Sequence, residues 1–144
     1  MSTHQKQFSE LVIEFQLHNG ALTHLAPSCQ KTARQICDQD LTQCYELLRN
    51  LKREHPVKPT GSDFQRQVWR LLRLVPEGDT ICYQNLANWM GNPKAVRAIG
   101  TAVGKNPISL LIPCHRVIQK SGKTGQYRWG ADLKQRLLDF ETTR

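Results

Sequence analysis

The sequence predicts an α+β fold in which a small N-terminal β-hairpin and helix precede a mainly α-helical domain. Residues 11–25, LVIEFQLHNGALTHL, contain two apolar segments on either side of a turn, which is typical of a hairpin. The second half instead contains short stretches with apolar residues at helical spacing and recognisable helix ends. The 144 residues, 39% of them hydrophobic, suffice for one domain of ordinary size or two small ones.

The N-terminal region contains the hairpin, one helix and a linker. Asn19-Gly20 suits a tight turn between the strands because both residues tolerate positive φ. Residues 41–51 place apolar side chains at helical spacing, which predicts a helix. The segment 54–61, EHPVKPTG, has two prolines and is typical of a linker. We therefore expect two parts, the N-terminal region 1–59 and a second domain 60–144.

The second domain is expected to begin with two helices. Ser62 followed by Gln65 matches a capping box, and the apolar face of the first helix continues until Pro76 and Gly78 stop it. Residues 83–90 are expected to form the second helix, which Gly91 closes.

Two more helices are expected after Gly91. Asn92-Pro93 would supply the N-cap and first position of a third helix that runs to about Gly104. The second and third helices then form a helix-turn-helix of winged-helix-like character, although many bundles also contain two helices joined by a glycine turn. The last helix is expected to start at Asp132, with Gln135 as its capping-box partner.

The third predicted helix, PKAVRAIGTAVGKN, is slim. Its long side chains are Lys94, Arg97 and Lys105, and most of the others are small. A minor groove about 6 Å wide requires such slimness, whereas a helix that reads the major groove usually offers several Arg, Gln or Asn side chains. The alternative is a buried helix whose small residues pack closely on a neighbour.

The charge distribution favours a nucleic-acid partner. Residues 80–131 contain no Asp or Glu but seven Lys or Arg, and the net charge is +7 over 60–144 against +1 over 1–59. A surface of one sign is expected where a protein meets phosphates, although a merely solvated basic face would look the same.

The composition argues against several other classes. No apolar stretch approaches the roughly 20 residues that span a bilayer, and the N-terminus has no apolar signal segment, so we expect a cytoplasmic protein without membrane contact. The five cysteines are odd in number and lack CxxC spacing, which argues against a disulfide framework and a zinc ribbon. We expect reduced thiols.

The segment 113–117, PCHRV, places a potential nucleophile, Cys114, beside a potential base, His115. A lone cysteine after an apolar run is more often an inert core thiol, and His115 could equally be a core histidine. Adjacent side chains diverge, so a bridging water is more plausible than direct contact between the two. The basic surroundings, Arg116 included, are expected to favour a thiolate.

The segments PKAVRA, NPISLLIPCHRV, YRWG and KQRLLDFE occur in an order and spacing that closely resemble the O6-alkylguanine-DNA alkyltransferase family. The resemblance covers residues 60–144. It implies repair of double-stranded DNA by a single, irreversible transfer of an alkyl group from guanine O6, with thymine O4 as a further candidate, to the protein's own cysteine. It also implies that the damaged base is flipped out of the duplex.

The resemblance also implies roles for individual residues. Cys114 would accept the alkyl group, His115 would act as base through a water, and Glu141 would orient the imidazole. Asn106 would brace the active-site turn, Tyr83 would donate to the departing guanine, and Arg97 would fill the stack that the flipped base leaves. The expected DNA contacts are Arg97, Lys94, Thr101, Ala98, Lys105 and Arg116. The expected pocket residues are Tyr127, Arg128, Trp129 and Val117.

No cofactor and no metal are expected, although some relatives bind zinc in the N-terminal part, so a site made of Cys29, Cys37, Cys44 and nearby histidines is conceivable. The protein is expected to act as a monomer. The N-terminal region is shorter than is usual in the family. Arg128 and Trp129 stand where several relatives have small residues, which predicts a tighter pocket mouth.

Three other functions share parts of this pattern. Alkyltransferase-like proteins bind the same lesions without reacting, but they replace the cysteine, so Cys114 argues against this class. A helix-turn-helix regulator would need no reactive thiol. A cysteine hydrolase would turn over repeatedly, whereas the favoured reaction stops after one event.

Overall fold

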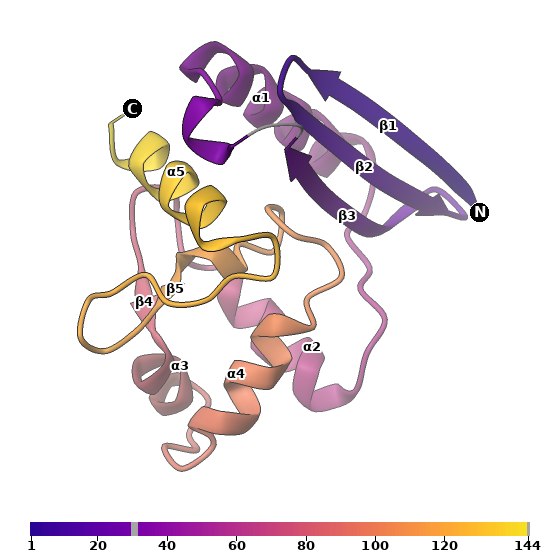
Figure 1. Cartoon of the computed structure of the whole chain (residues 1–144). Coiled ribbons are helices and arrows are strands. Elements are labelled where there is room, and N and C mark those ends of the chain that lie inside the picture. The colour runs from indigo at the N-terminus through magenta and orange to yellow at the C-terminus, as the bar shows by residue number, and fades with distance from the viewer. Residues whose placement is uncertain (30–31, 144) are drawn as a thin grey trace.

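The N-terminal part of the chain folds as a three-stranded antiparallel sheet followed by a long helix (Figure 1). The computed structural model describes residues 1–29 and 32–143. The strands pair in the order β1-β2-β3, and they are β1 (Ser2–Phe8), β2 (Leu11–His18) and β3 (Ala21–Cys29). A single 3₁₀ turn, η1 (Ala33–Gln35), precedes the helix α1 (Asp38–Glu54). The predicted helix at 41–51 is confirmed and extends further at both ends.

The predicted hairpin is confirmed as β2 and β3, but it is part of a larger sheet. Asn19 and Gly20 form the turn, with φ of 51° and 77°. The strand β1, which pairs with β2, is absent from the sequence-based prediction. All its side chains except Phe8 are exposed, so its sequence lacks the alternation of apolar and polar residues that marks a half-buried strand.

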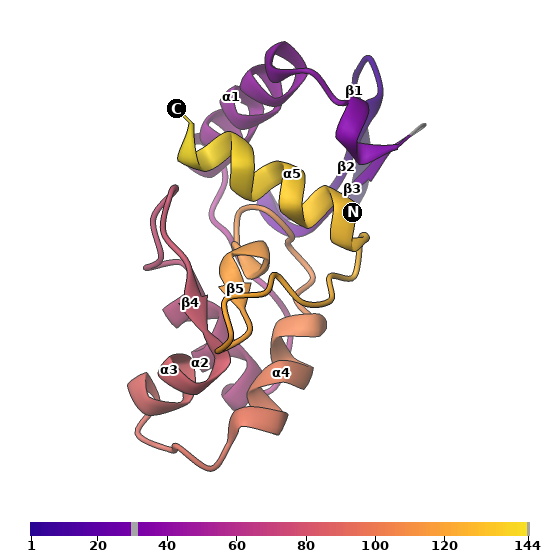
Figure 2. The ribbon, with the colours of Figure 1, turned by 60° about the vertical axis from the view of Figure 1, so that its left-hand side comes forward.

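The rest of the chain contains four helices and two very short strands within the described residues. In chain order they are α2 (Asp63–Leu72), β4 (Ile81–Cys82), α3 (Tyr83–Trp89), α4 (Val96–Gly104), β5 (Val117–Ile118) and α5 (Ala131–Thr142), with a 3₁₀ turn η2 (Cys114–Arg116) before β5. The strands β4 and β5 pair in parallel. Figure 2 shows α2, α3 and α4 grouped at one end of the molecule, while α5 lies beside α1 at the other.

The start of α2 is as predicted, whereas its end comes earlier. Ser62 Oγ accepts from the Gln65 backbone N–H at 3.2 Å, and Gln65 Oε1 accepts from the Ser62 N–H at 3.0 Å, which is a complete capping box. The helix ends at Leu72, before Val75. Pro76 disfavours helical geometry at the residue before it, so Val75 leaves the helix while its side chain remains buried.

The predicted start of the third helix is wrong. The helix α3 ends as expected near Gly91, but α4 begins at Val96 instead of Pro93. The Asn92 carbonyl accepts from the Ala95 N–H at 3.0 Å, so Asn92 and Pro93 form a turn between the helices instead of a cap. Proline suits the second position of such a turn as well as it suits a helix start.

The capping box predicted for the last helix is also wrong. The residue before α5 is Gly130, whose φ of 104° places it outside the range that other residues readily adopt. The Gln135 side chain donates to Asp139 Oδ1 at 2.8 Å, one turn further along, and therefore does not cap Asp132.

The free edge of β3 connects the sheet to the second half of the chain. Leu25 N–H donates to Pro107 O at 3.0 Å, and Ser109 N–H donates to Leu25 O at 2.9 Å. Further along β3, Leu22 exchanges hydrogen bonds of 2.8 and 2.9 Å with the segment 56–58. The strand thereby holds both the linker and the turn that leads to PCHRV.

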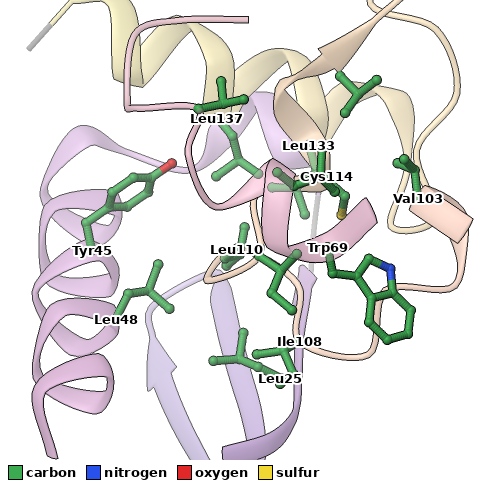
Figure 3. Packing of buried hydrophobic residues seen from close by; sticks show 14 of the residues in the cluster. Leu25, Tyr45, Leu48, Trp69, Val103, Ile108, Leu110, Cys114, Leu133 and Leu137 are labelled. Atoms are coloured by element: carbon green, nitrogen blue, oxygen red, sulfur yellow. The ribbon is translucent and has the colours of Figure 1, made fainter. Parts of the chain in front are cut away.

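A continuous apolar core crosses both parts of the chain. Leu25 of the sheet, Leu48 of α1 and Ile108 of the segment 106–116 around Cys114 lie in one cluster (Figure 3). Trp69 fixes α2 to α4, because its indole N–H donates to Ala102 O at 2.8 Å. Within the described residues, no helix has the length and apolar character needed to cross a membrane.

Candidate active site

The outer face of α4 and the two ends of this helix carry five of the six side chains that the sequence predicts to contact DNA. Ile99, Ala102 and Val103 are buried against the rest of the molecule. The opposite face exposes Arg97, Ala98 and Thr101. The turn before the helix exposes Lys94, and the residue after the helix is the exposed Lys105. The helices α3 and α4 pack against each other across that turn, which gives the predicted helix-turn-helix arrangement.

The segment that leads to Cys114 is held by the Asn106 side chain. Asn106 is 2% exposed, its amide donates to Ile112 O at 2.7 Å, and its carbonyl accepts from the Ile108 N–H at 2.9 Å. Between these two contacts, Leu110 adopts a φ of 74°, which a leucine rarely does. A strained turn of this kind persists only where its surroundings hold it in place, and Asn106 bonds to both of its sides.

Glu141, in the last turn of α5, is the centre of a buried hydrogen-bond network. Its Oε2 accepts from His115 Nε2 at 2.7 Å and from Tyr45 Oη at 2.5 Å. Arg116 binds the same carboxylate through two nitrogens, with Nε 2.8 Å from Oε1 and Nη2 3.0 Å from Oε2. Arg116 Nη1 also donates to Val75 O at 2.7 Å. All of these contacts are shielded from water, which strengthens each of them.

These contacts determine which nitrogen of His115 carries the proton. Burial alone would raise the pKa of Glu141, but the hydrogen bonds from His115 and Arg116 outweigh it and lower the pKa to about 2. The carboxylate is therefore ionised and only accepts, so Nε2 of His115 must donate. Burial lowers the pKa of His115 and keeps the imidazole neutral. Its other nitrogen, Nδ1, is left as a buried acceptor without a partner within the described residues.

Cys114 is buried at 6% exposure, and its thiol is neutral in this state. Burial raises the pKa of Cys114 above its usual range, and the opposing effects of Asn106, Lys134 and Ser109 are smaller. The prediction that the surroundings favour a thiolate is therefore wrong for the free protein. Arg116 does not contribute, because its guanidinium is bound to Glu141.

A cavity of about 370 Å³ opens onto Cys114. Its walls come from α3, α4, the segment 106–116 and the loop before α5. The lining residues are Tyr83, Gly100, Val103, Gly104, Asn106, Ser109, Cys114, Gln126, Tyr127 and Arg128. Figure 3 shows the Cys114 sulfur close to Val103 of α4. Burial and the nearby Cys114 raise the pKa of Tyr83, so its phenol remains a hydrogen-bond donor.

Three of the predicted positions differ from the structure. Val117 is fully buried in β5 and does not line the cavity. Trp129 does not line it either, because its indole N–H donates to Ser109 Oγ at 2.7 Å while the Arg128 guanidinium stacks over the ring at 4.7 Å. Arg116 is buried and paired with Glu141, so it cannot belong to the DNA-facing surface.

Three residues near the site are absent from the sequence-based prediction. Tyr45 reaches Glu141 from the N-terminal region. Ser109 lines the cavity and accepts from Trp129. Lys134 buries its ammonium, which donates to Val117 O at 2.6 Å, and burial lowers its pKa to about 8. Only Lys134 left a signal in the sequence, because the helical spacing of α5 places it on the same face as the buried Leu137 and Leu138.

The fold and the site together define a class of protein in which a buried cysteine lies at the base of a cavity next to a basic helix-turn-helix. The chain belongs to the family described as 6-O-methylguanine DNA methyltransferase, DNA binding domain, whose model matches residues 63–143.

The chain is also similar to individual proteins whose names fit this family. The chain is 49% identical over 92 residues to the methylated-DNA–protein-cysteine methyltransferase of Kluyveromyces lactis, which is 64% of this chain and 47% of that protein. The chain also matches the crystal structure of the Mycobacterium tuberculosis O6-methylguanine methyltransferase, with 30% sequence identity and a TM-score of 0.75. This match covers 99% of this chain and 93% of that one. The same organism's OGT in complex with DNA is 29% identical, with a TM-score of 0.74 over 98% and 91%. The chain thus spans about half the length of the Kluyveromyces lactis protein.

Proposed function

We propose that this protein repairs double-stranded DNA by moving an alkyl group from O6 of guanine to its own Cys114, once per chain. The observation that carries the proposal is the buried hydrogen-bond network, which leaves His115 Nδ1 as an unpaired acceptor. Membership of the family and the relative crystallised with DNA support it further. The DNA-binding unit would be residues 60–144, with residues 1–59 as a separate supporting region.

The proposed chemistry begins with deprotonation of the thiol. His115 Nδ1 takes the proton from Cys114 through one water, and the imidazolium that forms is stabilised by ionised Glu141. The sulfur attacks the alkyl carbon, and the bond from that carbon to O6 breaks. Tyr83 gives its phenol proton to the departing guanine, so that the base leaves without a negative charge. The phenolate then takes a proton from solvent while the His115 imidazolium releases one, so both groups return to their starting state. The product is a thioether, which no group in the cavity is equipped to cleave.

DNA would bind along the exposed face of α4. Its small side chains, Ala98 and Thr101, allow close approach to a minor groove, while Lys94 and Lys105 meet phosphates. Arg97 would enter the stack in place of the extruded guanine. In the same proposal the second domain is winged-helix-like, and the loop 119–130 takes the position of the wing.

Intact-protein and peptide mass spectrometry after incubation with a duplex that holds one O6-methylguanine tests this function. We expect one added methyl group per chain, mapped to the peptide that contains Cys114, and one repaired guanine per protein. Cys114→Ser is the matched control and should remain unmodified. Several repaired guanines per chain, or a methyl group mapped to Cys29, Cys37, Cys44 or Cys82, would contradict the proposal.

A further inference from the structure

Tyr45 belongs to α1 in the N-terminal region, yet its phenol is part of the network around Glu141. Its Oη donates to Glu141 Oε2 at 2.5 Å. The side chain is 3% exposed, and its ring packs on Phe140 of α5 with centroids 5.1 Å apart. Figure 3 shows the hydroxyl directed away from α1 toward the interior. The position of this donor is therefore set by the packing of α1 on α5.

Three donors share one carboxylate oxygen. Glu141 Oε2 accepts from Tyr45 Oη, from His115 Nε2 at 2.7 Å and from Arg116 Nη2 at 3.0 Å. Each donor disperses part of the negative charge and thereby reduces what is left to attract the others. Tyr45 remains a neutral donor, because burial and the adjacent Glu141 raise the pKa of its phenol.

We infer that Tyr45 is a positioning residue for the proposed alkyl transfer: its hydroxyl holds the Glu141 carboxylate in place and limits how strongly that carboxylate retains a second proton on His115. The inference rests on the proposed function, since His115 is assigned there as the base. It gives the N-terminal region a defined part in the chemistry, although the catalytic residues all come from the second part of the chain.

Other charged or titratable groups act on the same pair from the surrounding elements. Arg116 of η2 is bonded to Glu141, and both Arg116 and Lys134 of α5 lower the pKa of His115. Cys44 of α1 lies near the Tyr45 phenol, and Tyr127 of the loop before α5 interacts with Glu141. Tyr45→Phe leaves all of these groups in place and removes a single oxygen, so it isolates the contribution of the hydroxyl.

The sign of the expected effect follows from the charge on Glu141. Without the phenol hydroxyl, more of the carboxylate charge faces the His115 N–H, so the imidazolium is stabilised and the pKa of His115 rises. A base must be neutral to accept the thiol proton. The acid-side limb of the rate profile for methyl transfer should therefore move to higher pH in Tyr45→Phe, by roughly half a unit or more.

The experiment measures the rate of methyl transfer against pH for the wild type, Tyr45→Phe and the control Leu48→Val. Leu48 lies one turn further along α1 in the same core, so its truncation loosens the packing of α1 without touching Glu141. A shift in Tyr45→Phe with an unchanged profile in Leu48→Val supports the inference. Equal shifts in both variants, or no shift in either, overturn it.

A second measurement separates this inference from the proposed function. The titration of His115 is followed by NMR with labelled histidine, and its signal among the five histidines is assigned with His115→Gln. If the wild type transfers no methyl group, the proposed function fails while the titration still reports on Tyr45. Identical titrations of wild type and Tyr45→Phe would overturn the inference even if the wild type repairs DNA.

Discussion

The outer face of α4 and the network around Glu141 are both rich in charge, but the charges on α4 are exposed to solvent, whereas those around Glu141 are buried and paired. Lys94, Arg97 and Lys105 are exposed and take part in no ion pair within residues 1–29 and 32–143. Glu141 and Arg116 are buried and bonded to each other. Exposed charges act at a distance and are screened by salt, whereas buried paired ions are screened much less. Binding and chemistry should therefore be separable by mutation.

Cys114→Ser provides the strongest test of this separation. Transfer should be abolished, because a serine hydroxyl is a far weaker nucleophile than a thiol, while the exposed face of α4 is unchanged. DNA affinity should therefore stay close to that of the wild type. The transfer assay measures the loss of activity, and binding titrations by fluorescence anisotropy measure the DNA affinity that should remain. A loss of affinity as complete as the loss of transfer would show that the two regions are not independent.

Glu141→Gln should damage both chemistry and stability. The change leaves Arg116 as a buried charge without its carboxylate, which costs about 3–5 kcal/mol. Transfer should fall by roughly 10²-fold or more, because the His115 imidazolium loses its counter-ion. Urea unfolding and single-turnover kinetics measure the two effects. Asp139→Asn, an exposed change of the same chemical kind in the same helix, serves as the control and should alter neither.

The pH dependence of stability tests the same carboxylate. The pKa of Glu141 is lowered to about 2, so its contribution is present above the unfolded value and disappears as pH falls from about 4 towards 2. The size of this contribution is on the order of 3 kcal/mol. The stability difference between wild type and Glu141→Gln should therefore shrink across that range. A difference that stayed constant between pH 4 and pH 2 would mean that folding does not lower the pKa of Glu141.

Arg97→Ala tests the exposed face. Repair of a duplex should fall much more than reaction with a free alkylated base, because only the duplex requires the guanine to be extruded. Lys94→Ala and Lys105→Ala should instead weaken binding to all sequences, and each should reduce the slope of log affinity against log salt by about 0.9. Equal losses on duplex and free base would remove Arg97 from the extrusion step.

The smallest expected effect concerns the mouth of the cavity. Arg128 lines the cavity and stacks on Trp129, whose indole is tied to Ser109. Arg128→Gly should widen the mouth and raise the rate with benzyl adducts relative to methyl adducts, whereas Trp129→Phe should act only indirectly, by releasing Ser109. Competition between methylated and benzylated substrates measures the ratio. An unchanged ratio in Arg128→Gly would contradict this account.

The sequence predicted several features that depend on local pattern, although the local signals at Asn92-Pro93 and Asp132 were misleading. The Asn19-Gly20 turn, the Ser62 capping box and the exposed face of α4 each follow from residues a few positions apart. What could not be predicted depends on distant partners. Arg116 resembled a surface cation until Glu141, 25 positions away, was found to bind it in the interior. Tyr45 resembled an ordinary apolar position of α1, since no helical pattern shows that its hydroxyl meets a carboxylate 96 positions away.

The hydrogen bonds of β3 also determine how two copies of the sheet could meet. One edge of the sheet is already occupied by the segments 56–58 and 107–109, so within the part of the chain that the structure describes only β1 offers a free edge to this sheet. Its polar side chains, with Lys6 among them, discourage pairing with another chain. Even if two copies joined through β1, each would have used its one available edge, so the assembly would close as a dimer and could not grow into a fibre.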